Sequence, residues 1–459
     1  MIKILLAFLT VVMLGSCSGT RSLKKADIVM PDRLGHDSDT TSSIADMSWR
    51  DFYTDSLLRG YIECTLNENR DLLSAAARVD ELKELYGVQK LNYAPNIRGI
   101  VGETRETNDY YGEKSTIDPE ISFKFTLNWE IDLWGGLSYA RKQAGAKYLG
   151  SVEERRSMQI TLIAEVARAY YNLVALKNEL NIVRQTLLTR EQALDKAKLR
   201  YEGGLTSELV YQQARVEHAT TASLVPGLQN RIVLCENALN LLMGKLPDNP
   251  VAVNAEALDS DPGSILPVGI PSRVLERRPD VRSAEQSLKA AFAACGVAYS
   301  NQFPKLTIGI TGGWENDEVK NLFRSPFSYI LGNIAGTVLD FGRNRRKYKS
   351  SVAAYEQARL KYEKSVMAAF SEVDGAISTY QEMRKTTRLR MELRDAAAKY
   401  VNLANMQYNA GSINYIDVLD AHRRYFDART NFSNAVRDEY LAMVALYKSL
   451  GGGWSDTDN

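Results

Sequence analysis

Residues 121–133 read I-S-F-K-F-T-L-N-W-E-I-D-L, with an apolar side chain at every odd position and a polar one at every even position. This period of two is typical of a β-strand with one face in an apolar environment. The run of 13 residues is longer than the about 9–11 residues that a tilted strand needs to cross a bilayer. We therefore predict a membrane strand with one lipid-facing and one water-facing side.

Three further segments complete two predicted strand pairs. Residues 97–106 show the weakest alternation of the four, and they precede the polar loop 107–119. In the second pair the apolar positions are Leu306, Ile308, Ile310, Trp314, Phe327, Tyr329 and Leu331, with a slip in the pattern near Asn333. The polar loop 315–326 lies between these two strands. Aromatic residues that we expect near the membrane interfaces are Tyr110, Tyr111, Trp129, Trp134 and Trp314.

The two halves of the chain repeat each other at an offset of 207 residues, which carries Gly204 onto Gly411 and Gly135 onto Gly342. Each half contains a long stretch without proline and with apolar heptads, at 135–204 and 342–411, which predicts helices of about 100 Å. Shorter helices are predicted to return at 207–243 and 414–450, and others to lead into the strands at 67–94 and 280–302. We expect Pro226 to kink or divide the first returning helix.

The first residues predict export. Lys3 and the apolar run 4–14 are typical of a signal peptide, and L-G-S-C at 14–17 is typical of a lipobox, in which Cys17 is acylated. Ordinary cleavage near Ser16 is the alternative. Ser18 favours delivery to the outer membrane. The remaining cysteines, Cys64, Cys235 and Cys295, are expected as buried thiols, with one disulfide left open.

Composition and motifs exclude several classes of protein. The net charge of +1 shows no excess of basic residues for binding nucleic acid. The histidines, His36, His218 and His422, are scattered, and no hydrolase, metalloprotease or phosphate-loop motif occurs. We therefore expect no catalysis, no metal and no cofactor, apart from the covalent lipid on Cys17.

Four strands cannot close a barrel, because membrane barrels contain about eight strands or more and lipid does not tolerate open sheet edges. The chain must therefore oligomerise. Three copies are the smallest sufficient number, and they give twelve strands with Lys124, Thr126 and Asn128 facing water; four copies would also close.

Several motifs resemble the TolC-like outer-membrane efflux proteins, in particular the lipidated branch that serves resistance-nodulation-division pumps. The most specific is P-S-R-V-L-E-R-R-P-D-V-R-S-A-E at 271–285; others are D-L-W-G at 132–135, L-D-F-G at 339–342 and Y-N-A-G at 408–411. The resemblance implies a mainly α fold with a transmembrane β-barrel. In this channel-tunnel a homotrimer closes a 12-stranded β-barrel in the outer membrane and a 12-column α-barrel in the periplasm. It also implies a periplasmic adaptor protein and an inner-membrane pump as partners.

The resemblance further implies a gate at the periplasmic mouth. Asp417 and Asp420 would form acidic rings, Ile416 an apolar ring, and Tyr408 would brace the closed state. Ile413 and Val210 stand where an arginine and its acidic partner would be expected, so closure should depend on packing and on hydrogen bonds of Tyr408. The alternative is that Asp417 only caps its helix after Asn414.

We predict that Gly204 and Gly411 lie at the periplasmic tips, where the long helices turn back. Ser207 and Ser412 beside them are then candidate contacts for the adaptor. The alternative is that both glycines are ordinary helix ends without a partner.

The expected function is a passive exit duct that carries drugs or other small molecules from pump and adaptor to the exterior. The alternatives are the channel of a type I protein secretion system and, in a different class, a periplasmic coiled-coil scaffold lipoprotein. The expected segments are 1–16 signal peptide, 17–50 lipidated tether, 51–95 first periplasmic helices, 96–134 first strand pair, 135–246 first helical hairpin, 247–279 linker, 280–303 second periplasmic helix, 304–341 second strand pair, 342–451 second helical hairpin and 452–459 tail.

Overall fold

The computed structural model describes residues 23–24, 26, 44–109, 111–112, 115–247, 249–254, 258, 277–335 and 340–452. The expectations for the signal peptide, Cys17, Tyr110 and most of the two linkers lie outside the described residues. The chain divides into two compact units. The first comprises Met1–Ile28, Ala77–Glu153 and Arg282–Ser365, and the second comprises Val29–Ala76, Glu154–Val281 and Val366–Asn459.

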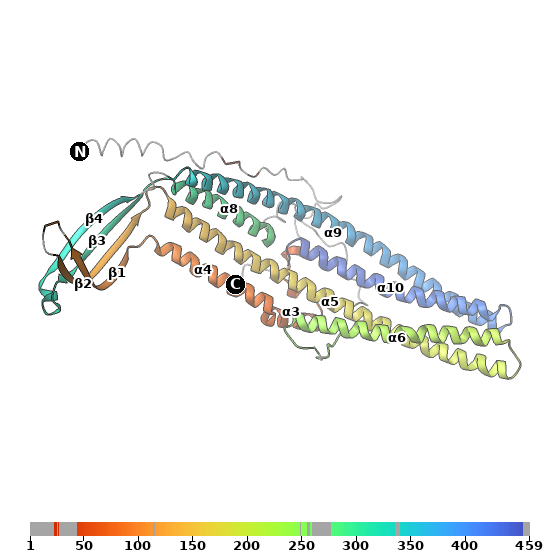
Figure 1. Cartoon of the computed structure of the whole chain (residues 1–459). Helices are drawn as coiled ribbons and strands as arrows, with labels where there is room; N and C mark the ends of the chain where they lie inside the picture. The colour runs from red at the N-terminus through yellow and green to blue at the C-terminus, as the bar shows by residue number, and fades with distance from the viewer. Residues whose placement is uncertain are drawn as a thin grey trace. The chain divides into compact units, whose positions relative to one another are not determined.

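The first unit contains one antiparallel sheet of four strands in the order β1-β2-β3-β4 (Figure 1). The strands are β1 (Asn96–Asn108), β2 (Thr116–Ile131), β3 (Lys305–Asn316) and β4 (Pro326–Ala335). A short 3-10 helix, η3 (Val319–Arg324), lies between β3 and β4. The four strands and their two pairs confirm the prediction from the alternating sequence.

The sheet has one apolar and one polar face. Phe123 pairs with Val101 on one side and with Trp314 on the other, and its ring stacks on that of Trp314 with centroids 6.0 Å apart. Leu127 pairs in the same way with Ile97 and Ile310. The next residue of β2 on the polar face, Lys124, forms ion pairs of 3.0 Å with Glu120 and with Glu315.

Strand β4 differs from the expected pattern. Phe327 and Tyr329 pair with Gly313 and Thr311, so both rings lie on the polar face with Lys124. The ammonium group of Lys124 is 5.6 Å from the ring centroid of Phe327. A Cβ atom at position 313 would overlap the backbone carbonyl of Phe123 in the neighbouring strand, so glycine is the residue that fits there. The pairing also continues without a slip through Asn333 to Ala335.

Strand β2 ends at Ile131, before residue 133, because Asp132 caps the first turn of the next helix, which begins at Gly136. The Asp132 carboxylate accepts hydrogen bonds from the backbone N–H groups of Leu137 (3.0 Å) and Ser138 (2.8 Å). These donors would otherwise have no partner in the first turn of the helix. At its other end β2 begins at Thr116, so the loop after β1 is shorter than predicted.

The helices reproduce the offset of 207 residues. Helices α5 (Gly136–Glu202) and α9 (Arg343–Asn409) each contain 67 residues, and α6 (Glu208–Leu242) and α10 (Tyr415–Ser449) each contain 35. The other helices are α2 (Trp49–Phe52), α3 (Ser56–Glu68), α4 (Arg70–Leu91) and α8 (Pro279–Ser300), with the 3-10 helix η1 (Ile44–Asp46). Within the described residues no helix is both long enough and apolar enough to span a membrane.

Pro226 does not divide α6, contrary to the expected joint. The helix continues from Glu208 to Leu242 with Pro226 inside it. Leu228 is buried against Leu176, Leu180 and Val183 of α5, and this packing continues beyond the proline. Burial of these side chains offsets the missing backbone hydrogen bond of the proline.

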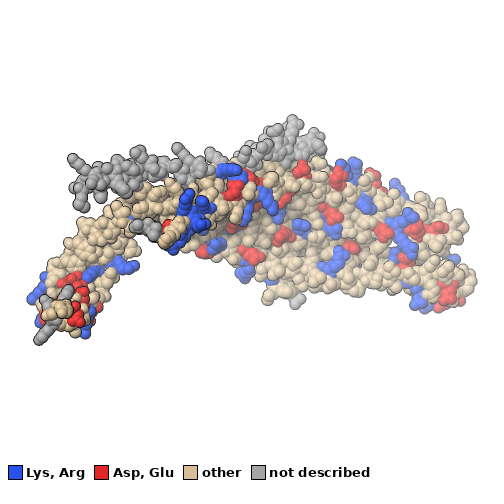
Figure 2. All heavy atoms as spheres, turned by 45° about the horizontal axis from the view of Figure 1, so that its top comes forward, with Lys and Arg blue, Asp and Glu red and all other residues tan. Residues whose placement is uncertain are grey.

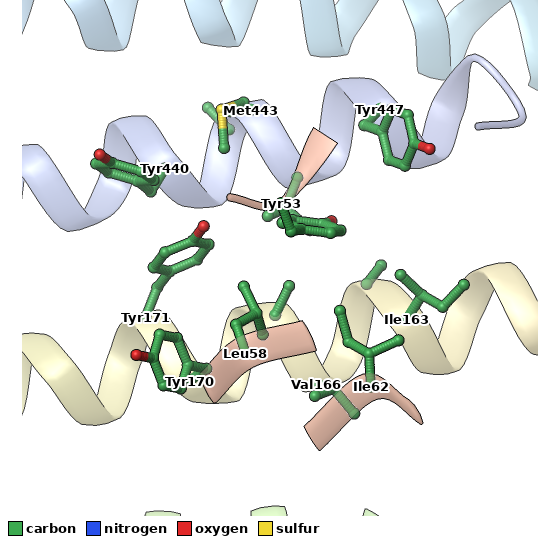
Figure 3. Close-up of a cluster of buried hydrophobic side chains, with 14 of the residues drawn as sticks. Tyr53, Leu58, Ile62, Ile163, Val166, Tyr170, Tyr171, Tyr440, Met443 and Tyr447 are labelled. Carbon is green, nitrogen blue, oxygen red and sulfur yellow. The ribbon is translucent and has the colours of Figure 1, made fainter. Parts of the chain in front are cut away.

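The main core of the second unit lies where α2 and α3 contact α5 and α10 (Figure 3). Phe52 stacks on Tyr447 with ring centroids 4.0 Å apart, and the Tyr447 hydroxyl donates to the Met47 carbonyl at 2.7 Å. The Tyr170 hydroxyl donates to Asp55 at 2.7 Å, and burial raises the pKa of this phenol. Cys64, Cys235 and Cys295 are free thiols, so the disulfide that the sequence left open is not formed.

Candidate functional site at the helix tips

Both long helices end at a glycine with a left-handed backbone. Gly204 has φ +69° and Gly411 has φ +75°. The Leu205 N–H donates to the Arg200 carbonyl at 2.8 Å, and in the second half the Ser412 N–H donates to the Gln407 carbonyl at 2.9 Å. These bonds are the Schellman ending, in which a residue without Cβ adopts the left-handed conformation at low cost. Each glycine therefore reverses the chain into the next helix.

The first tip exposes apolar side chains beside the predicted contact residues. Ser207 is the N-cap residue of α6, and Leu205 and Leu209 next to it are 73% and 67% exposed. The repeat carries Leu209 onto Ile416, which is 58% exposed. The exposure of Leu205 and Leu209 was not predicted, although two leucines beside a turn glycine are a signal in the sequence.

The predicted gate residue Tyr408 links the two helical hairpins. Its hydroxyl accepts a hydrogen bond of 3.0 Å from Nη1 of Arg200, near the end of α5. Its ring lies 5.7 Å from that of Tyr415 and packs with Ile413 against the buried cluster Val401, Ala404, Val418 and Ala421. Ile413 therefore packs against this cluster, at the position where the sequence comparison with the TolC-like family led us to expect an arginine.

The two predicted gate carboxylates have different surroundings. Asp417 is exposed, and its Oδ2 accepts from the Asn414 N–H at 3.1 Å, which is the capping contact of the alternative interpretation. Asp420 accepts from Nε of Arg424 at 2.7 Å, one turn further along α10. The hydrogen bond with Asp420 raises the pKa of Arg424. Within one chain, Asp420 is thus paired and Asp417 is a helix cap.

An ion-pair cluster behind the tip was not predicted. Glu217 of α6 is only 9% exposed, and its carboxylate contacts Nη1 of Arg190 of α5 at 3.0 Å. The same carboxylate accepts from Nε of Arg423 of α10 at 2.6 Å. Arg190 also donates to the Glu217 carbonyl at 2.9 Å and to the hydroxyl of Thr221. The cluster therefore joins hairpin α5–α6 to hairpin α9–α10.

The electrostatics of this cluster follow from burial. Desolvation lowers the pKa of Arg190, whereas the hydrogen bond with Glu217 raises the pKa of Arg423. Burial and then the positive charge of Arg190 lower the pKa of His422. Glu217 lies between Ala214 and Thr221, two buried residues that are seven positions apart on α6. A charged residue on this buried face of the helix was the signal that the sequence offered.

Known proteins that this chain resembles are described as outer-membrane proteins. The family model for outer membrane efflux proteins matches residues 61–245 and 270–452. The toluene efflux pump outer membrane protein TtgF of Pseudomonas putida is 33% identical over 426 residues, covering 90% of this chain and 86% of the relative. The probable outer membrane lipoprotein SilC of Salmonella typhimurium is 27% identical, covering 90% and 89%.

Solved structures show the same fold. The outer-membrane channel OprN matches with a TM-score of 0.84 at 24% identity, covering 94% of this chain and 99% of that chain. The predicted TolC-like architecture of long helices and a small antiparallel sheet is therefore confirmed.

Proposed function

The chain belongs to the outer membrane efflux protein family, and we propose that three copies of it form the exit duct of a tripartite efflux system. The protein is a component of the outer membrane. In this proposal it receives small molecules from an inner-membrane pump of the resistance-nodulation-division type and a periplasmic adaptor, and it conducts them passively to the exterior.

The observation that carries this proposal is the sheet with two unpaired edges. In the described part of the chain, β1 and β4 each pair with only one strand. Backbone groups without partners are costly in lipid, so the edges need strands from other copies. Three copies would supply twelve strands and close a barrel with the Phe123 and Leu127 face toward lipid. The Lys124 face would then line a wet lumen.

The helix tips are the proposed contact for the adaptor. Gly204 and Gly411 turn the chain, and Ser207 and Ser412 lie next to them. The exposed leucines beside Ser207 add apolar area, which suits a protein partner better than water.

The proposed gate combines Tyr408, Ile416, Asp417 and Asp420 around the periplasmic mouth. Threefold repetition would bring six carboxylates to one axis, where they attract cations. The pairing of Asp420 with Arg424 reduces this charge, so Asp417 would carry most of it. Tyr408 and the cluster around Glu217 would hold the hairpins in the closed arrangement.

We also propose that Cys17 is acylated and anchors the chain. The lipobox supports this, and the name of the relative SilC describes a lipoprotein. The proposal includes no cofactor and no catalysis. A coiled-coil scaffold would not need the observed sheet, and relatives named as efflux pump components favour efflux over type I protein secretion.

Conductance of the purified protein in planar bilayers tests the proposed duct. We expect a nearly shut channel that multivalent cations block further from the periplasmic side. Replacing both Asp417 and Asp420 by alanine should remove the block. Asp374→Ala is the matched control, because it removes an exposed carboxylate of α9 that lies far from the tip and outside the cluster around Glu217. No channel activity in any variant would contradict the duct, and a block unchanged in the double variant would contradict the gate alone.

A further inference from the structure

A cleft in the first unit lies between α5, α8 and the first two turns of α9. This open cleft has a volume of about 390 Å³, within the range of small-molecule pockets. Its polar lining consists of Gln143, Asn301, Asn344 and Lys347. The rest is small apolar side chains of α8, among them Ala294 and Ala298, and none of the side chains described as lining the cleft is acidic.

The cleft adjoins an unusual group of cations. Residues 343–349 read R-N-R-R-K-Y-K, so five of seven side chains at the start of α9 are basic. Aligned backbone dipoles make a helix N-terminus unfavourable for cations, and the first turn of α9 holds no acidic residue. Figure 2 shows Lys and Arg side chains gathered where the sheet meets the helices of this unit.

Within the described part of the chain, few negative charges balance these five cations. None of the five lies within ion-pair distance of a described carboxylate. Asp340 acts electrostatically on Arg343, but its carboxylate already accepts from the N–H groups of Gly342 and Asn344, both at 2.9 Å. The local fold thus holds positive charge that an external anion would balance.

We propose that this cleft binds an amphipathic organic anion, in which an acidic group is attached to an apolar body. The ammonium group of Lys347 and the side-chain amides of Asn301 and Asn344 would donate to a carboxylate or phosphate. Ala294 and Ala298 would contact the apolar body. Two sources share this chemistry: a soluble anion and the headgroup of an anionic phospholipid. The site is independent of the gate at the helix tips.

Binding of 1-naphthoate to the full-length protein in phosphatidylcholine nanodiscs, measured by calorimetry, tests the proposal. Lys347→Gln should weaken binding about tenfold, since it removes a charge-assisted hydrogen bond. Lys349→Gln is the matched control: it removes the same charge two residues away, outside the cleft, and should change binding less than about twofold. Ala298→Leu should also weaken binding, because it fills the cleft without changing charge.

The neutral analogue 1-naphthalenemethanol should bind much more weakly than 1-naphthoate. Nanodiscs that contain phosphatidylglycerol separate the two sources. Competition by this lipid would assign the cleft to a headgroup, and undiminished binding would assign it to a soluble anion; both results support an anion site. Equal losses in Lys347→Gln and Lys349→Gln, or no binding to the wild type, would overturn the proposal.

Discussion

Removal of the Glu217 carboxylate should loosen the link between the two helical hairpins. In Glu217→Gln, the Arg190 guanidinium, 14% exposed, keeps its charge but loses its anionic partner. Removing one partner of a buried ion pair lowers the stability by about 3–5 kcal/mol. Arg423 is 59% exposed, so water screens its interaction with Glu217. Arg423→Gln should therefore lower the stability by about 1 kcal/mol or less.

Hydrogen exchange of the backbone amides near Glu217 in α6 and near Arg423 in α10 measures this difference. A cost of about 3 kcal/mol corresponds to exchange on the order of a hundredfold faster in Glu217→Gln, against less than about tenfold in Arg423→Gln. Glu208→Gln is the control, since Glu208 is an exposed acid at the start of the same helix. Equal effects of Glu217→Gln and Arg423→Gln would refute the reasoning that burial of Arg190 sets the cost.

Three further predictions concern other parts of the chain. Mass spectrometry of the mature N-terminus should find a lipid on Cys17, and Cys17→Ser should keep its channel activity; an unmodified mature terminus elsewhere contradicts the anchor. Cysteines at Ser207 or Ser412 should crosslink to the adaptor, whereas crosslinks only from the loops of the sheet would exclude the tips. The pKa of His422 is lowered in the folded protein, so its contribution to stability is complete above the ordinary histidine pKa of about 6.5 and decreases as the pH falls below that value. The thermal unfolding temperature of His422→Gln should therefore depend less on pH than that of the wild type. An unchanged pH profile would contradict this prediction.

Much of the fold was predictable because its patterns are long. The alternation from Ile121 onward specified a strand, and the shared offset of Gly204 and Gly411 specified two equal hairpins. The face of β4 was not predictable, because it depends on pairing: Phe327 lies opposite Gly313, and a glycine carries no hydropathy signal. The continuity of α6 through Pro226 was not predictable either, because it depends on the packing of Leu228 against α5.

The candidate site was predictable only where a local motif marks it. The tip glycines and the cap at Asp417 could be predicted from the residues next to them in the sequence. The contact between Glu217 and Arg423 joins residues that are 206 positions apart, and no spacing rule in a single sequence reports such a pair. The same holds for the hydrogen bond between Arg200 and Tyr408.

Crosslinking of the sheet edges tests the trimeric duct most directly. Cysteines are placed on the edge strands at Val101 of β1 and Ile330 of β4, which are 75% and 74% exposed, in a background where Cys64, Cys235 and Cys295 are alanine. Neighbouring positions, Ile97 and Ile334, cover other registers between copies. Oxidation of the double-cysteine variant in outer membranes should give a ladder that ends at three chains, whereas either cysteine alone should give no link, because β1 of one copy would meet β4 of the next. A ladder that ends at four chains, or no link between β1 and β4 in any combination, would contradict the trimeric barrel.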